Sequence, residues 1–165
     1  PTTRIVGIAT GLNFPADIAV DSSGNIWVDN YNGNSVEEFS SSASGNATPT
    51  VTISGVATTL NFPVGLWRDI HGNIWIGNNG TSSILEFAPT ASGNVAPINI
   101  IAGALTNQNS TTGVAVDAKG YIYQDGPNTN AINVFAPGAT GNVAPVQTIV
   151  NGSSALTALW SVGIH

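Results

Sequence analysis

Short runs of apolar and β-branched residues recur along this chain, separated by stretches rich in Gly, Asn and Ser. The clearest run is Gly-Asn-Ile-Trp-Ile-Gly-Asn at residues 72–78, which recurs upstream at 24–30 and more loosely downstream at 120–126. The copies are therefore 48 residues apart both times. A fixed period of this length is typical of solenoids, propellers and other repeat arrays.

Each repeat contains four such runs, which we expect to be strands. In the first repeat they cover residues 17–21, 24–30, 35–39 and 51–55. They are rich in β-branched and aromatic residues, and turn residues separate them. An Asp-x-x-Gly sequence joins the first run to the second in every repeat and predicts a tight hairpin, because Asp bonds nearby backbone and Gly accepts positive φ. The pattern predicts an all-β chain of β-propeller blades, each with four antiparallel strands. A β-solenoid with 48-residue coils is the alternative, which the hairpins disfavour.

The repeat register divides the chain into one domain of three complete blades with partial blades at both ends. The expected complete blades cover about residues 12–55, 60–103 and 108–151, and the partial ones 1–8 and 152–165. An ordinary closed ring needs roughly four to eight blades, and the chain contains no Met. We therefore expect an incomplete propeller, either a segment of a larger one or a protomer that completes its ring through partner chains.

The composition narrows the partners that such a protein could bind. Apolar residues make up 42% of the chain and mean hydropathy is +0.17, as in a globular protein with a core. Only 7% of residues are charged, and three basic residues against nine acidic ones leave a net charge of −6. Nucleic acid binds through clustered Lys and Arg, so we do not expect it as a partner. No apolar run approaches the roughly 18 residues of a membrane-spanning helix, so no membrane insertion is expected.

The polar surface must come from Ser, Thr, Asn and Gly, because so few side chains are charged. A surface of this kind has little charge repulsion to keep molecules apart. We expect its partners to be copies of the chain or the missing blades of a longer chain, with a glycan or another protein as further candidates. We also expect an extracellular or cell-surface setting for a secreted, processed product.

Residues 14–21, Phe-Pro-Ala-Asp-Ile-Ala-Val-Asp, and the Gly-Asn-Ile-Trp-Val that follows at 24–28 resemble an NHL-type repeat and the related streptogramin (virginiamycin B) lyase propellers. Residues 62–76 and 113–123 match the same pattern, so the resemblance covers nearly the whole chain. It implies a propeller with its binding sites at the end that carries the Phe-Pro loops. Neither the basic residue that NHL blades often place before the third strand nor the His and acidic residues of the lyases has a counterpart here. The resemblance therefore implies a fold rather than one activity.

Trp67 and Arg68 are candidate ligand-binding residues because they break the repeat. The other two repeats carry Ala-Val at this position of the innermost strand. A charge there must be paired or hydrated. We expect Arg68 to pair with Asp17 or Asp69. The alternative is a site for an anion or a carbonyl group with Trp67 as its wall, and Asp17 is a further candidate ligand-binding residue.

The loop between the second and third strands supplies the other candidates. Asp29, Asn30, Asn78 and Asp125 lie there, and their oxygens could bind Ca²⁺ or hydrogen-bond a glycan. The alternative is that they are ordinary solvated loop residues. No other cofactor and no dedicated metal site are expected.

Other recurring residues have a structural explanation. Trp27, Trp75 and Tyr123 occupy one phase of the repeat, which favours packing between blades over a stacking row for sugars. The chain has no catalytic motif and two His, one of them in a hairpin turn. We therefore expect a non-enzymatic structural or recognition module. The alternative is a fragment of a lyase- or lactonase-like propeller enzyme with a site near the propeller axis.

Overall fold

A computed structural model describes residues 3–126, 128 and 130–150. In this part of the chain, twelve strands form three four-stranded antiparallel sheets, each built from consecutive strands. Blade 1 contains β1 (Pro15–Val20), β2 (Ile26–Asn30), β3 (Ser35–Phe39) and β4 (Val51–Ser54). Blade 2 contains β5 (Pro63–Arg68), β6 (Ile74–Asn78), β7 (Ser83–Phe87) and β8 (Asn99–Ile101). Blade 3 contains β9 (Val114–Val116), β10 (Ile122–Gly126), β11 (Ala131–Phe135) and β12 (Gln147–Val150).

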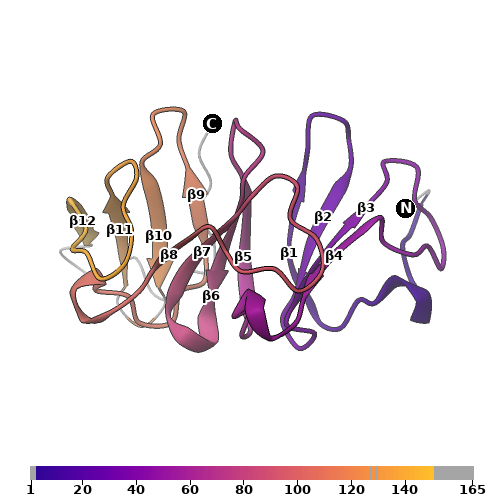
Figure 1. Cartoon of the computed structure of the whole chain (residues 1–165), viewed down its shortest axis with the longest axis horizontal. Coiled ribbons are helices and arrows are strands. Elements are labelled where there is room, and N and C mark those ends of the chain that lie inside the picture. Colours follow the sequence, from indigo (N-terminus) through magenta and orange to yellow (C-terminus); the bar gives the residue numbers. More distant parts are fainter. Residues whose placement is uncertain (1–2, 127, 129, 151–165) are drawn as a thin grey trace.

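The three sheets follow one another in chain order across the molecule (Figure 1). Their first strands, β1, β5 and β9, contact one another in that order, as the innermost strands of adjacent propeller blades do. The predicted all-β fold with four antiparallel strands per 48-residue repeat is confirmed. The expected partial blade at 152–165 lies outside the described residues. No helix in the described ranges is long and apolar enough to cross a membrane.

Adjacent blades are joined along their outer strands by one repeated contact. Ile53 in β4 forms a parallel bridge with Gly93 in the loop of blade 2, and Ile101 in β8 does the same with Gly141 in blade 3. Ile5 forms the equivalent bridge with Gly45 of blade 1. Residues 3–7 therefore lie where the last strand of a preceding blade would lie.

Short 3-10 turns connect the blades and were not predicted from the sequence pattern. They are η1 (Ile8–Thr10), η2 (Val56–Thr58) and η4 (Ala104–Thr106); a fourth, η3 (Asn79–Thr81), lies inside blade 2. Each of the three connecting turns is held by an Asn of the following blade. In the first, the Asn46 side-chain oxygen accepts the backbone N–H of Ala9 at 2.7 Å. The repeated Gly-Asn pairs therefore fix the joint between blades as well as a turn.

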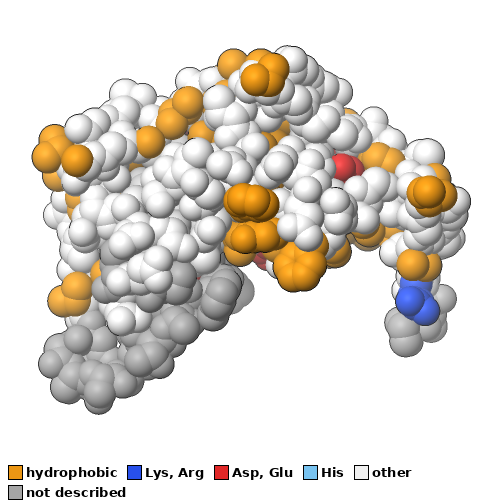
Figure 2. Space-filling view, turned by 90° about the horizontal axis from the view of Figure 1, so that it is seen from below, with side chains coloured by type: hydrophobic (Ala, Val, Ile, Leu, Met, Phe, Trp, Pro, Cys, Tyr) orange, Lys and Arg blue, Asp and Glu red, His pale blue; other side chains and the backbone are white. Residues whose placement is uncertain are grey.

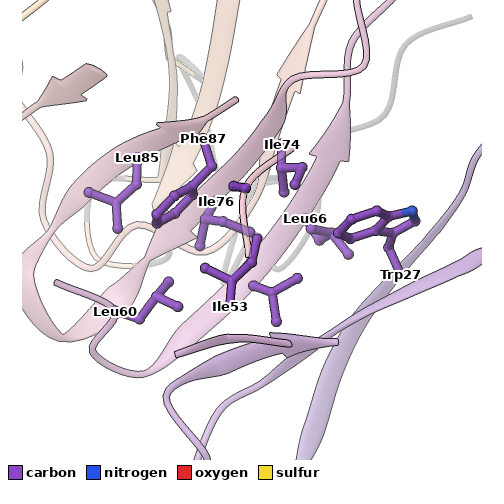
Figure 3. Close-up of a cluster of buried hydrophobic side chains, with 10 residues drawn as sticks. Trp27, Ile53, Leu60, Leu66, Ile74, Ile76, Leu85 and Phe87 are labelled. Carbon is purple, nitrogen blue, oxygen red and sulfur yellow. The ribbon is translucent and has the colours of Figure 1, made fainter. Parts of the chain in front are cut away.

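A buried apolar cluster fills the space between blades 1 and 2 (Figure 3). Trp27 is 3% exposed and Phe87 is fully buried. The members of the cluster are Trp27, Val36, Ile53, Leu60, Leu66, Ile74, Ile76, Leu85, Phe87 and Ala91. A second cluster that contains Trp75 and Phe135 lies between blades 2 and 3. The two recurring Trp residues therefore pack between blades.

The Asp of each Asp-x-x-Gly hairpin closes its turn. In blade 2, Asp69 Oδ1 accepts the backbone N–H groups of His71 (2.8 Å) and Asn73 (2.9 Å). Its Oδ2 accepts the indole N–H of Trp75 at 3.0 Å. The equivalent residues are Asp21 and Asp117. Each carboxylate thus ties its hairpin to an aromatic side chain of the second strand.

Removal of this carboxylate should destabilise the fold. Asp69→Ala leaves two backbone N–H groups and one indole N–H without their acceptor, so we expect a loss of about 1.5 kcal/mol in the free energy of unfolding. Urea denaturation followed by Trp fluorescence measures it. Asp69→Asn keeps an acceptor oxygen and should lose less. An equal loss in both variants would contradict the role given to the backbone acceptor.

Candidate functional site

The seven candidate residues do not form one site. Asp17, Asp29 and Asp125 lie toward the end of the blades that carries the Phe-Pro loops. Trp67 and Arg68 lie at the far end of β5, next to the hairpin. Asn30 and Asn78 are each buried within their own blade. The predicted position in a solvated loop is wrong for four candidates, because they lie in strands β2, β6 and β10 and are fully buried: Asp29, Asn30, Asn78 and Asp125.

Asp17 joins the innermost strands of blades 1 and 2. Its Oδ2 accepts the backbone N–H of Leu66 in β5 at 3.0 Å, and its own N–H donates to Asp29 Oδ1 at 2.6 Å. Burial raises the pKa of the Asp17 carboxyl above its ordinary value, and the negative charge of Asp125 raises it further. The main contact of the Asp17 carboxylate is therefore a hydrogen bond that joins blade 1 to blade 2.

Asp29 and Asp125 make the same contact in blades 1 and 3. Asp125 Oδ1 accepts the backbone N–H of Gly113, which occupies the repeat position of Asp17. Both carboxylates are fully buried, and the Oδ2 of each has no hydrogen-bond partner among the described residues. Burial raises the pKa of Asp29 to about 7, and the charges of Asp17 and Glu37 contribute. Across the described ranges, no three His, Asp or Glu residues are arranged to hold a metal ion.

Asn30 and Asn78 hold the loop that precedes the innermost strand. Asn78 Oδ1 accepts the backbone N–H of Asn61 at 2.7 Å, and its amide donates to the Thr59 carbonyl at 3.0 Å. Asn30 Oδ1 accepts the backbone N–H of Asn13 at 3.1 Å. These contacts use the amide groups inside the blade, so neither side chain presents them to solvent.

The ion pair expected for Arg68 is wrong. Its guanidinium lies over the ring of Trp27 in blade 1, 4.3 Å from the ring centroid, and its Nη1 has no hydrogen-bond partner among the described residues. A cation over an aromatic face is attracted by the negative charge of the ring face. Trp67 donates its indole N–H to the Val116 carbonyl of blade 3 at 3.1 Å. The two residues that break the repeat thus link blade 2 to its two neighbours.

Glu37 is a buried carboxyl that the sequence interpretation did not single out. It is 3% exposed, and its oxygens accept hydrogen bonds from Ser35 Oγ (2.8 Å) and from the Asn30 amide. Burial raises the pKa of Glu37 to about 7. A signal existed in the repeat, because the same position holds Leu85 in blade 2 and Asn133 in blade 3. Such a pKa suits acid–base chemistry, but this carboxyl lies inside blade 1 without access to a substrate.

The Phe-Pro loops and the residue that follows β2 carry a partly exposed row of aromatic rings, which we call the aromatic ledge. It consists of Phe14, Tyr31 and Phe62. The rings of Tyr31 and Phe62 stack at 4.8 Å between centroids, and Phe14 lies tilted against Tyr31 at 5.6 Å. Phe14 is 65% exposed and Phe62 is 40% exposed. Figure 2, which looks onto this end of the molecule, shows hydrophobic side chains gathered near the middle of the concave edge.

A groove of about 630 Å³ lies beside Phe14 and Tyr31, two of the three ledge residues. Its lining residues are Phe14, Pro15, Ala16, Asp17, Tyr31, Val64, Asn79 and Ser110. It therefore brings the one candidate carboxylate that is half exposed, Asp17, next to aromatic rings that the sequence interpretation did not propose.

No protein-family model matches this chain, and no curated protein matches its sequence. Solved structures do resemble it. The catalytically inactive virginiamycin B lyase from Staphylococcus aureus with quinupristin superposes with a TM-score of 0.65 at 12% identity, over 92% of this chain and 46% of that one. A nidogen/laminin complex superposes with a TM-score of 0.69 at 18% identity, over 93% and 53%.

The WD40 β-propeller domain of Doa1 superposes on the chain with a TM-score of 0.65 at 13% identity, over 90% of this chain and 44% of that one. The chain thus spans about half the length of these structures. Because the identities are low and the named proteins differ in their roles, the likeness shows the β-propeller fold alone.

Proposed function

We propose that this β-propeller chain is a non-enzymatic, extracellular structural or recognition module that packs against further blades of the same repeat. The extracellular setting is supported by composition, in which Ser, Thr and Asn take the place of charged residues. The packing is supported by one observation. The outward-facing side of blade 1 and the outward-facing side of blade 3 carry apolar residues equivalent to those that are buried on the two sides of the interface between blades 1 and 2. They are therefore the two halves of such an interface.

The leading face of blade 1 is the first half. It consists of Leu12, Ile18, Ile26, Val28, Phe39 and Ala43, which line a groove of about 590 Å³. The residues 48 positions later are Leu60, Leu66, Ile74, Ile76, Phe87 and Ala91, and all of them are buried between blades 1 and 2. Ile18 is 60% exposed, whereas its equivalent Leu66 is 3% exposed. Exposed apolar surface of this kind marks a protein interface.

The trailing face of blade 3 is the second half. It consists of Tyr123, Ile132 and Ile149, which occupy the repeat positions of the buried residues Trp27, Val36 and Ile53. Ile149 is 42% exposed, and all four residues of β12 are exposed. An uncovered edge strand presents unpaired backbone groups to another strand.

Residues 3–7 show how such a neighbour is held. Val6 N–H donates to the Gly45 carbonyl (2.8 Å), and Gly45 N–H donates to the Arg4 carbonyl (2.6 Å). The same pair of bonds joins β4 to Gly93 in the next blade. The leading face thus already carries one short segment, bridged at Ile5, in the position that the last strand of a preceding blade would take.

The association of the 165-residue chain tests this proposal, because each copy offers both halves of the interface, with β12 of one copy taking the place of residues 3–7 on the next copy. We expect light scattering coupled to size-exclusion chromatography to give a mass above 16.8 kDa. Ile18→Asp and Ile149→Asp should each reduce association, because they place a charge in the apolar contact. Val56→Asp, at a position 90% exposed in η2, is the matched control. A monodisperse 16.8 kDa chain would overturn the proposal.

A further inference from the structure

The contact between Tyr31 and Phe62 departs from the repeat in a way that packing does not require. The residues 48 positions later are Asn79 and Ser110, which meet at the next junction between blades. There the Asn79 amide donates to Ser110 Oγ at 2.7 Å. The same place in the fold therefore holds a ring stack at one junction and a hydrogen bond at the next.

The exposure of Phe62 does not arise from the open face of blade 1. Phe62 lies at the junction of blades 1 and 2 and is still 40% exposed with both neighbours present. An aromatic ring that faces solvent inside a complete junction adds little to the core and is free to contact a ligand.

The backbone under the ledge is held in place. Phe14 and Phe62 have φ of +56° and +51°, a region that costs a bulky residue about 1 kcal/mol or more. The Asn34 side chain accepts the Phe62 backbone N–H at 2.7 Å, and the Phe14 carbonyl accepts the Tyr31 N–H at 3.0 Å. The rings are therefore pre-positioned on fixed loops, which lowers the entropy lost when a ligand binds.

We propose that the aromatic ledge and its groove bind a neutral pyranose sugar. The C–H bonds on one face of the sugar ring carry partial positive charge and suit the negative faces of aromatic rings such as Phe14 and Tyr31, the two ledge rings that line the groove. Phe62 stacks on Tyr31 and holds that ring in place. The sugar hydroxyls would then meet the polar end of the groove, at Asn79, Ser110 and the Asp17 carboxylate. The groove volume of about 630 Å³ lies within the range of small-ligand sites.

The charge of the groove decides between classes of ligand. Its lining contains the Asp17 carboxylate and no Lys or Arg. A phosphorylated or carboxylated sugar would therefore be repelled, and a purely apolar ring would gain no hydrogen bond from Asn79, Ser110 or Asp17. A neutral ring with many hydroxyl groups suits both the aromatic side and the polar side of the groove.

This inference deepens the recognition role proposed above and rests on it. The three ledge rings are not among the residues of the leading and trailing faces, although their groove shares Pro15, Ala16 and Asp17 with the groove of the leading face. The test is titration of the full chain with methyl β-D-glucopyranoside and methyl α-D-mannopyranoside, followed by calorimetry and by the ring-current shifts of the sugar protons. Cyclohexanol serves as a largely apolar ring with a single hydroxyl, and glucose 6-phosphate as the anionic sugar. We expect at least one neutral glycoside to bind more tightly than both.

Two ledge variants locate the binding. Phe62→Ala and Tyr31→Ala should each weaken the neutral glycoside about tenfold, and Val56→Ala, which removes another exposed apolar side chain, should not. The mass of each variant, measured alongside, should equal that of the unmodified chain, so that loss of sugar binding is separate from loss of association. Absence of binding by both glycosides, equal binding of cyclohexanol, or full binding by both ledge variants would overturn the proposal.

Discussion

Phe87→Ala should lower the free energy of unfolding by about 4 kcal/mol, because it removes a fully buried ring from the apolar cluster between blades 1 and 2. A domain of this size is stabilised by roughly 5–15 kcal/mol, so this single change removes a large part of the total. Urea denaturation followed by Trp fluorescence should show a lower midpoint with an unchanged slope.

Phe14→Ala is the matched control for this change. The residue type is the same, but Phe14 is 65% exposed, so its removal should cost less than about 1 kcal/mol. Equal losses in the two variants would contradict a shared core between the blades, because the exposed ring and the buried ring would then contribute equally to the free energy of unfolding.

The stability of the chain should fall as pH rises from 4 to 7 and change little above that range. The pKa of Asp29 and the pKa of Glu37 are both raised by burial, to about 7. The folded chain therefore holds protons in this range that the unfolded chain has already released. Unfolding releases protons, so a rise in pH favours the unfolded state.

Glu37→Gln should remove part of this dependence. The amide carries no charge to bury, so the variant should gain about 2 kcal/mol at pH 8, after allowance for solvent screening, and nothing at pH 4. Denaturation at a series of pH values measures the difference. Glu38→Gln, on the half-exposed opposite face of β3, should keep the unmodified profile. A Glu37→Gln curve parallel to that of the unmodified chain would contradict the assignment.

The repeat made the strands predictable. The third strands lie where the pattern placed them, at residues 35–39, 83–87 and 131–135, because three copies in one register fix the phase that a single copy leaves open. The 3-10 turns between blades were not predicted, since they are held by Asn side chains 37 residues further along the chain.

The partner of Arg68 could not be predicted for the same reason. Asp69 is its neighbour in sequence, but the strand points successive side chains to opposite faces. The ring that the guanidinium meets, Trp27, belongs to blade 1 and is brought there only by the packing of the blades. Whether the candidate residues bind a ligand stays a prediction.

The ledge could have been found by the rule that identified Trp67 and Arg68. Tyr31 and Phe62 both change character at the next repeat, and a comparison of residues 48 positions apart shows it. What the comparison could not show is that these two residues, 31 positions apart, lie face to face. That required the geometry of two adjacent blades.

The exchange of Tyr31 and Phe62 for Asn79 and Ser110 shows that one pair of positions differs in chemistry between the two junctions. Each junction between blades offers one pair of positions on fixed loops, and the pair accepts either two rings or two hydrogen-bonding side chains without a change in the strands around it. The selectivity of a ligand site at these positions could therefore be changed at one junction at a time, by two substitutions that leave the strands unchanged. Asn79→Tyr combined with Ser110→Phe would place the same aromatic pair at both junctions.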